Sequence, residues 1–209
     1  MTEVENIIFD LGGVLINLDY QKTRKAFENA GVVDFDSYYN QTKQKDLFND
    51  YEIGKISNNA FLQQLKQLMN VNIEDDVIIS CWNAMLMDLP LRRLNLLENI
   101  NSKYRIFLLS NTNAIHIEAF GKYIENEYGY NKFLNLFQKV YYSNVLGMRK
   151  PNVETFKKVL LMNNLNPSQT IFIDDSIQHL EGAKAAGIRT IHHLTNSEIS
   201  DTLKSHGLI

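Results

Sequence analysis

The stretch Ile7-Ile8-Phe9-Asp10-Leu11-Gly12-Gly13 decides how this chain is expected to fold. A short run of apolar residues is typical of a strand that is buried on both faces of a sheet. The two glycines allow the backbone to turn sharply directly after that strand. Asp10 therefore stands at the carboxyl end of a strand, which is where ligands bind in open α/β sheets.

The same arrangement recurs further along the chain. Ile106–Leu109 precedes Ser110-Asn111, and Ile171–Ile173 precedes Asp174-Asp175. Because strands and helix-length segments alternate, the sequence predicts right-handed crossovers and a mostly parallel sheet, that is, an α/β fold. Two further strands are expected at 140–142 and 190–193, and helices at 113–128, 151–164, 176–187 and 196–205.

One interval interrupts the alternation. Between Asp10 and Ile106 no convincing strand is found, and apolar residues recur at helical spacing instead. Residues 17–88 are therefore interpreted as a helical cap inserted after the first strand, with Ser57 capping its middle helix and Trp82 in its core. The α/β core is expected to comprise 1–16 and 89–209, and its first helix after the insertion to span 91–101. An insertion at this point lies over the site and could act as a lid.

Composition narrows the class of protein. The 209 residues carry a net charge of −3, with 44% hydrophobic and 22% charged residues, so an extended nucleic-acid interface is not expected. No apolar run has the length of a membrane span, and the acidic N-terminus does not resemble a secretory signal. Cys81 is the only cysteine, so a cytoplasmic protein without an internal disulfide is expected. The sequence does not indicate an oligomeric state. His116 is placed on a helix surface or at the rim of the site.

The polar residues after the strands suggest phosphoryl transfer. Asp10 is the predicted nucleophile, because a carboxylate can attack phosphorus and form an aspartyl-phosphate. The Ser110 hydroxyl and the Asn111 backbone N–H are expected to bind phosphoryl oxygens. Lys150 is expected to supply a positive charge there, with Pro151 in the first turn of the following helix.

Three carboxylates in one pocket would repel one another, which predicts a divalent cation. Mg²⁺ takes oxygen ligands in octahedral geometry. Asp10, the backbone carbonyl of Gly12 and Asp175 would suffice to hold it. Asp174 is expected either to bind the ion directly or to contact one of the groups that bind it.

Four segments resemble the motifs of the haloacid dehalogenase-like hydrolases, in order and over nearly the whole chain. The family resemblance implies a Rossmann-like parallel sheet with strand order 5-4-1-2-3 and a cap between the first two motifs. It also implies a phosphatase that acts on a small phosphorylated metabolite, with a sugar phosphate as one candidate. The cap segment Glu52–Ser57 and Trp82 resemble the branch that includes bacterial α-glucose-1-phosphate phosphatases. The four segments are 9–14, 109–113, 147–151 and 172–176.

Gly12 departs from the family pattern, because phosphatases of the family usually carry a second aspartate there as general acid and base. General acid–base catalysis contributes about 10²–10⁴-fold. Two alternatives therefore stay open: a metal-independent 2-haloacid dehalogenase, and a non-catalytic protein that binds phosphate or a partner. Asp19 is a further hypothesis, as a carboxylate that reaches back to replace the missing acid.

Overall fold

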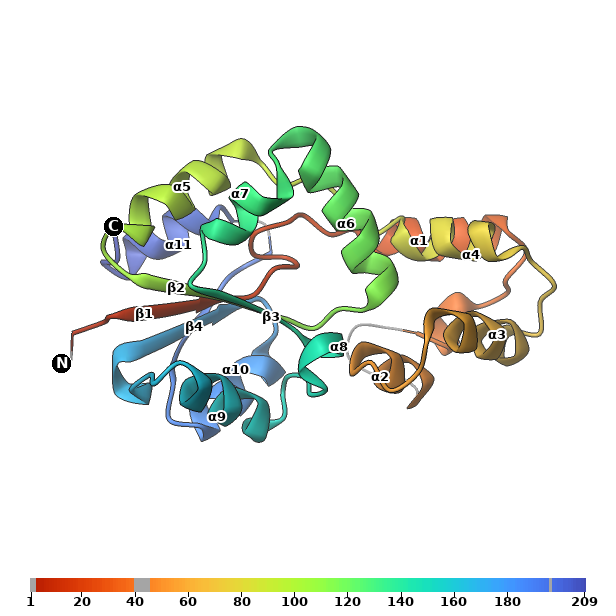
Figure 1. Ribbon diagram of the computed structural model, residues 1–209. Helices are drawn as coiled ribbons and strands as arrows, with labels where there is room; N and C mark the ends of the chain where they lie inside the picture. Colours follow the sequence, from red (N-terminus) through yellow and green to blue (C-terminus); the bar gives the residue numbers. More distant parts are fainter. Residues whose placement is uncertain (1–2, 40–45, 196) are drawn as a thin grey trace.

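The computed structural model describes residues 3–39, 46–195 and 197–209. Within these ranges, five parallel strands form one sheet in the order β3-β2-β1-β4-β5, which confirms the predicted α/β fold and its strand order (Figure 1). The strands are β1 (Asn6–Phe9), β2 (Arg105–Ser110), β3 (Lys139–Tyr142), β4 (Thr170–Asp174) and β5 (Arg189–His192).

Helices connect the strands and cover the sheet. Around the sheet they are α5 (Leu91–Asn101), α6 (Ala114–Glu127), α7 (Tyr130–Asn135), α8 (Ser143–Leu146), α9 (Val153–Met162), α10 (Ile177–Ala185) and α11 (Ile199–Ser205). A separate group comprises α1 (Tyr20–Asn29), α2 (Asp46–Glu52), α3 (Asn58–Met69) and α4 (Asp75–Asn83). Among the described residues, no helix is both long and apolar enough to span a membrane.

Strand β1 lies at the centre of the sheet because its side chains are apolar on both faces. Ile8 pairs in register with Phe107 on β2 and with Phe172 on β4. Alternate residues point to opposite faces of a strand, so Ile7 and Phe9 face one helical layer and Ile8 faces the other.

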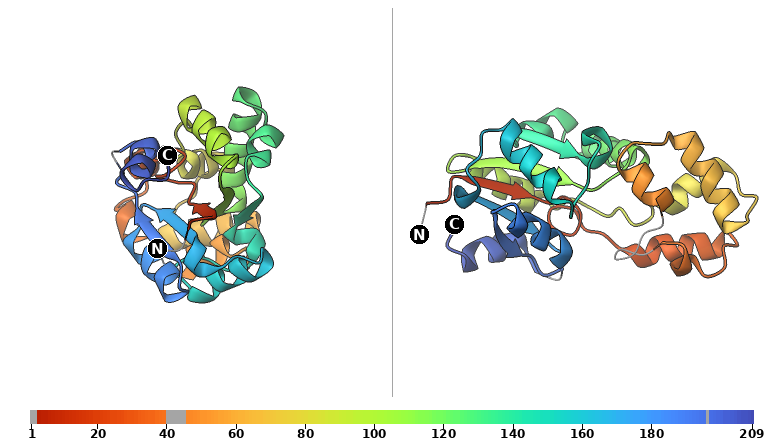
Figure 2. Two further views of the ribbon diagram at one scale, coloured as in Figure 1. Left: turned by 90° about the vertical axis from the view of Figure 1, so that its left-hand side faces the viewer. Right: turned by 90° about the horizontal axis from the view of Figure 1, so that it is seen from below.

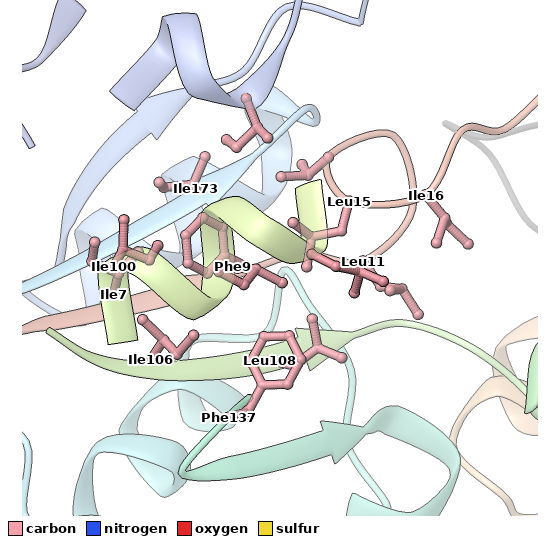
Figure 3. Close-up of a cluster of buried hydrophobic side chains, with 14 of the residues drawn as sticks. Ile7, Phe9, Leu11, Leu15, Ile16, Ile100, Ile106, Leu108, Phe137 and Ile173 are labelled. Carbon is pink, nitrogen blue, oxygen red and sulfur yellow. The ribbon is translucent and has the colours of Figure 1, made fainter. Parts of the chain in front are cut away.

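Two hydrophobic cores hold the sheet between these layers. Side chains of α5, α6, α7 and α11 pack on the face that presents Ile7 and Phe9, and Figure 3 shows Ile100 and Phe137 in this cluster. Phe156, Val159 and Leu180 of α9 and α10 pack on the opposite face, around Ile8. Figure 1 shows the two layers above and below the sheet.

Helices α1–α4 form a layer with its own apolar cluster, built around Phe27, Phe48, Phe61 and Trp82. The layer lies beyond the carboxyl ends of the strands (Figures 1 and 2). Its two connections to the sheet run side by side, with the Asn17 N–H donating to the Asp88 carbonyl at 2.9 Å. We call this group the α1–α4 layer. The predicted division into a cap at 17–88 and a core remains a prediction, and its parts at 1–2, 40–45 and 196 lie outside the described residues.

Several predicted elements need correction at their ends. The helix expected at 151–164 begins at Val153, because the Asn152 side chain caps it by accepting the Glu154 N–H at 3.0 Å. Pro151 therefore precedes the helix instead of lying in its first turn. Strand β5 ends at His192, and His193 lies beyond it. The short helices α7 and α8 were not predicted. Ser57 does cap α3, as expected.

Candidate active site

Asp10 follows the central strand and opens the turn above it. Its backbone N–H continues the sheet by donating to the Ile173 carbonyl at 2.9 Å. Its carboxylate accepts the Leu11 N–H at 2.7 Å, which fixes the side chain at the mouth of the turn. Only 7% of the residue is exposed. The predicted nucleophile is therefore held rigidly in a largely dry position.

Lys150 is fully buried and bridges two of the three predicted carboxylates. Its Nζ lies 2.8 Å from Asp10 Oδ1 and 2.7 Å from Asp174 Oδ2. Burial opposes the positive charge, but the two carboxylates raise the pKa of the Lys150 ammonium above its ordinary value. The lysine thus lies beneath Asp10 as a fixed positive charge.

The oxygens of Asp174 are occupied by donors from the protein. Oδ2 accepts from Lys150, and Oδ1 accepts the Ser176 N–H at 2.8 Å and lies 3.0 Å from His179 Nδ1. A carboxylate can only accept, so the His179 Nδ1 carries the proton in this contact. Burial opposes the charge, but Lys150 and His179 lower the pKa of Asp174 to about 2. Asp174 is therefore ionised and engaged in holding Lys150.

Asp175 lies against the glycine turn instead. A Cβ placed on Gly13 would come within 2.5 Å of Asp175 Oδ2, and Gly13 has φ +75°, so this position needs glycine. Burial and the neighbouring Asp174 raise the pKa of Asp175 to about 6. Burial likewise raises the pKa of Asp10 to about 8, although Lys150 opposes that shift. Burial is the largest cause of the raised pKa in both groups, so a bound cation would favour the ionised form of each carboxyl group.

A pocket of about 880 Å³, including space open to solvent, lies between the sheet and the α1–α4 layer. Asp10 and Asp175 both line it. The sheet side also contributes Gly12, Ser110, Asn111 and His179, and the α1–α4 side contributes Tyr20, Tyr39, Glu52 and Met85.

The structure brings most of the predicted site residues to this pocket. Asp10, Gly12, Ser110, Asn111 and Asp175 all line it, whereas Lys150 and Asp174 lie beneath it.

Two residues have contacts that differ from the expectations. The Asn111 side chain bonds the Lys150 backbone twice, from Nδ2 to the carbonyl at 2.9 Å and from the Lys150 N–H to Oδ1 at 2.9 Å. Asp19 is not among the lining residues, and its carboxylate caps α1 by accepting the Gln21 N–H. The structure does not support Asp19 as a substitute acid.

Pocket residues that were not predicted as site residues include Tyr20, Tyr39, Glu52, Arg149 and His179. Arg149 adjoins Lys150, and Glu52 lies in the cap segment already noted. Their shared contact, with Arg149 Nε 2.8 Å from Glu52 Oε2, joins distant parts of the chain and has no local signal. His179 lies in the first turn of α10, which faces the pocket.

His116 also lines the pocket, but it is 8% exposed and not at the helix surface. Its Nε2 lies 3.1 Å from the Trp82 carbonyl, and its ring stacks on the Trp82 indole with centroids 5.1 Å apart. Burial lowers the pKa of His116 to about 4, so the ring is neutral near pH 7. The contact joins α6 to the α1–α4 layer.

Two sets of side chains could hold a cation. Asp10, Asp174 and His179 offer ligand atoms within 4.8 Å of one another. However, Lys150 already contacts both aspartates of that set. The contacts of Asp10 with Lys150 and with the Leu11 N–H both use Oδ1, so Oδ2 of Asp10 together with Asp175 fits a hard divalent ion better.

The comparisons with known proteins agree with this geometry. A family model described as haloacid dehalogenase-like hydrolase matches residues 7–193. A D-ribitol-5-phosphate phosphatase of Bacteroides thetaiotaomicron is 31% identical over 189 residues, which are 90% of this chain and 90% of that protein. A sesquiterpene phosphatase of Aspergillus oryzae is 24% identical over 94% of this chain and 92% of its own.

Solved structures are similar over almost the full length. A haloacid dehalogenase family enzyme from Bacteroides thetaiotaomicron, crystallised with magnesium and inorganic phosphate, has a TM-score of 0.87 and 32% identity, covering 95% of this chain and 98% of that one. A HAD-like family hydrolase from Porphyromonas gingivalis has a TM-score of 0.87 and 25% identity, covering 98% of each chain. These matches confirm the prediction of a phosphomonoesterase of this type. The chain belongs to the haloacid dehalogenase-like hydrolase family.

Proposed function

We propose that the protein is a magnesium-dependent phosphatase that hydrolyses a phosphorylated sugar or sugar alcohol through an aspartyl-phosphate on Asp10. The observation that carries the proposal is the pairing of Asp10 with Lys150 beneath a pocket that Asp175 also lines. A nucleophilic carboxylate, a fixed positive charge and a second carboxylate for a metal are the components that phosphoryl transfer requires.

The residues present fit a magnesium ion. Asp10 and Asp175 line the same pocket, burial raises the pKa of each, and the close approach of Asp175 to Gly13 places it beside the glycine turn. Asp10, Asp175 and the Gly12 carbonyl would therefore hold the ion, while Asp174 would hold Lys150. When bound, Mg²⁺ would neutralise charge between the nucleophile and the phosphoryl group.

The chain's own residues then account for the two steps. The Ser110 hydroxyl and the Asn111 N–H hold phosphoryl oxygens, and an Asp10 oxygen attacks phosphorus. The P–O bond to the leaving group breaks, and the released alkoxide takes a proton from water, because Gly12 offers no acid. A second water attacks the phosphorus of the aspartyl-phosphate, which releases inorganic phosphate and restores the Asp10 carboxylate.

Two lines of support favour a hydroxyl-rich leaving group. The relative from Bacteroides thetaiotaomicron is named for D-ribitol 5-phosphate, a phosphorylated sugar alcohol. In this chain the α1–α4 side of the pocket offers two tyrosines and Glu52, and Arg149 lies beside them. Such polar groups suit hydroxyl recognition better than an apolar ligand.

The first test is hydrolysis of p-nitrophenyl phosphate with and without Mg²⁺. We expect release that requires Mg²⁺ and that falls at least about 10³-fold in Asp10→Asn, because the nucleophile is lost. Asp19→Asn is the matched control and should keep the wild-type rate. A panel of sugar phosphates and alditol phosphates, with a prenyl phosphate as the apolar comparison, then tests the substrate class.

The same assays separate the alternatives. Chloride release from a 2-chloro acid without Mg²⁺ would support the dehalogenase. Binding of inorganic phosphate without any Asp10-dependent turnover would support the non-catalytic protein. Preference for the prenyl phosphate would overturn the proposed substrate class while leaving the phosphatase activity intact.

A further inference from the structure

Glu52, the last residue of α2, contacts the sheet side of the molecule with both its backbone and its side chain. Its carbonyl accepts a hydrogen bond of 2.6 Å from the Ser143 hydroxyl at the start of α8. Its carboxylate forms an ion pair with Arg149, with Oε2 2.8 Å from Nε. Glu52 is 7% exposed, so both contacts lie in a largely dry junction. One residue of the α1–α4 layer thus holds two separate segments of the sheet side.

The first contact leads to the loop that follows β2. Ser143 is 1% exposed; its hydroxyl oxygen accepts the Thr112 N–H at 2.9 Å, and its proton is within hydrogen-bond reach of the Glu52 carbonyl at 2.6 Å and of the Thr112 carbonyl at 3.0 Å. Thr112 directly follows Ser110-Asn111, the proposed phosphate-binding pair. The Ser143 hydroxyl therefore links the end of α2 to the phosphate-binding loop.

The ion pair between Glu52 and Arg149 links α2 to the segment that holds Lys150, and this segment is in turn bonded to the loop after β2. Arg149 directly precedes Lys150. The two hydrogen bonds between the Asn111 side chain and the Lys150 backbone join this segment to the loop after β2. Glu52, Ser143, Thr112, Asn111, Lys150 and Arg149 thus close a ring, which we call the Glu52 ring.

Resting on the proposed phosphatase function, we propose that Glu52 and Ser143 are positioning residues. Through the Glu52 ring, docking of the α1–α4 layer sets the relative position of Ser110-Asn111 and Lys150, and hence of the phosphoryl oxygens above Asp10. Neither residue touches the reacting atoms in this scheme. Both act through the segments that hold Ser110-Asn111 and Lys150.

The physical reason lies in how steeply phosphoryl transfer depends on geometry. A displacement of about 1 Å in a positioning group can cost about 10²-fold in rate. Ser110 ends β2, whereas Lys150 lies in the loop between α8 and α9, so their spacing depends on contacts between loops. Glu52 is linked to one loop through Ser143 and to the other through Arg149, and the Asn111 side chain joins the two loops directly.

The test uses full-length protein with Mg²⁺ and two readouts: affinity for inorganic phosphate by calorimetry, and kcat and KM for p-nitrophenyl phosphate. We expect Glu52→Ala and Ser143→Ala each to weaken phosphate binding and to lower kcat/KM by about ten- to hundredfold. Glu52→Gln keeps the size of the side chain but removes the charge that pairs with Arg149, so it should lose less activity than Glu52→Ala. Asp50→Ala is the matched control on the same helix, since among the described residues the Asp50 side chain pairs with the exposed Lys55 and no other side chain, and it should match wild type.

The double variant distinguishes positioning from a general loss of stability. Members of one network are expected to be non-additive, so Glu52→Ala with Ser143→Ala should lose less than the product of the two single effects. Folded variants with wild-type kcat/KM and phosphate affinity, or strictly multiplicative losses, would overturn the positioning role. If Glu52→Ala does not fold, Glu52→Gln and Ser143→Ala carry the same comparison. Wild-type protein that neither binds phosphate nor hydrolyses the ester would instead overturn the proposed function.

Discussion

Two neighbouring aspartates, Asp174 and Asp175, have different environments and therefore different properties. Asp174 is surrounded by donors and keeps its charge at all but very low pH. Asp175 faces the pocket and the glycine turn, and its pKa is about 6. A difference of this size between adjacent carboxyl groups separates a residue that holds Lys150 from one that can hold a metal.

The affinity for Mg²⁺ is expected to fall at acid pH, because the ion binds the ionised forms of Asp10 and Asp175, and both have raised pKa values. Titration calorimetry between pH 7.5 and pH 5 should show the dissociation constant weakening by about tenfold or more, since one unit below the pKa only about a tenth of Asp175 is ionised. Asp175→Asn should bind Mg²⁺ weakly over the whole range. A wild-type affinity independent of pH would contradict the assignment.

The raised pKa of Asp175 has the opposite effect on the stability of the metal-free protein. The folded pKa lies above the ordinary value of 3.8, so protonated Asp175 favours folding. This stabilisation of the folded protein is present below about pH 4 and is lost as the pH rises through about 6. Urea unfolding with a chelator present should show this decline, and the decline should be smaller in Asp175→Asn.

At the scale of elements, Glu198 joins α11 to α5. Its carboxylate accepts from Arg92 at 2.6 and 2.9 Å and from Arg93 at 3.2 Å. Arg93 is 5% exposed and also donates to the Leu15 carbonyl at 3.0 Å, so the junction reaches the loop after Asp10. The Glu198 carboxylate thus compensates the charge of a largely buried guanidinium.

Glu198→Gln should therefore lower the free energy of unfolding by about 1–3 kcal/mol, the usual range for hydrogen bonds to charged groups. Urea unfolding measures the change. Hydrogen bonding from Arg92, with Arg93, lowers the pKa of Glu198 to about 2. The wild-type advantage should thus disappear as the pH falls from about 4.5 through about 2. Asp201→Asn on the same helix, at an exposed pair, should change stability by less than about 0.5 kcal/mol.

Gly54 lies where α2 meets α8. A Cβ at this position would come within 2.1 Å of the Asn144 carbonyl oxygen, and the backbone has φ +70°. Gly54→Ala should therefore push the end of α2 away from the sheet side and lower kcat/KM for p-nitrophenyl phosphate by about tenfold or more.

Gly207→Ala provides the control for Gly54→Ala. Gly207 has φ +68° with no atom within 4 Å of an added Cβ, so it tests backbone strain without the clash. Its activity should be unchanged. Equal activity in the two variants would show that the contact with Asn144 does not matter for catalysis.

Local patterns were sufficient to predict most elements of the sheet. Apolar runs such as Ile7–Phe9 lie in strands buried on both faces, and the helix predicted at 91–101 has the observed bounds. The start of α9 was missed because Asn152, not Pro151, caps it. The helices α7 and α8 have six and four residues, too few to show a clear helical period.

At the scale of the whole molecule, the site is assembled from segments that are distant in sequence. Strand ends predicted which backbone positions meet, because parallel strands share one carboxyl edge. They could not predict that Lys150 lies between two carboxylates, or that Glu52 meets Arg149. The Glu52–Arg149 contact depends on the packing of the α1–α4 layer against the sheet, and the position of Lys150 depends on how the loop between α8 and α9 lies against β1 and β4. Neither has a signature in a local window of sequence.

Metal binding should stabilise the entire fold, because the predicted ligands come together only in the folded chain. At a Mg²⁺ concentration of 100 times the dissociation constant, the free energy of unfolding should rise by about 2.7 kcal/mol. Thermal or urea unfolding with Mg²⁺ and with a chelator measures the difference. Asp175→Asn should show little change on adding Mg²⁺, and an equal shift in that variant would place the ion elsewhere.

The stacking of Trp82 on His116 gives the molecule an internal optical reporter. Trp82 is the chain's single tryptophan, so all indole fluorescence comes from the junction between α4 and α6. Its ring is 2% exposed. Any rearrangement that separates the two helices would bring water to the indole and shift its emission to longer wavelength, which allows that movement to be followed in unlabelled protein.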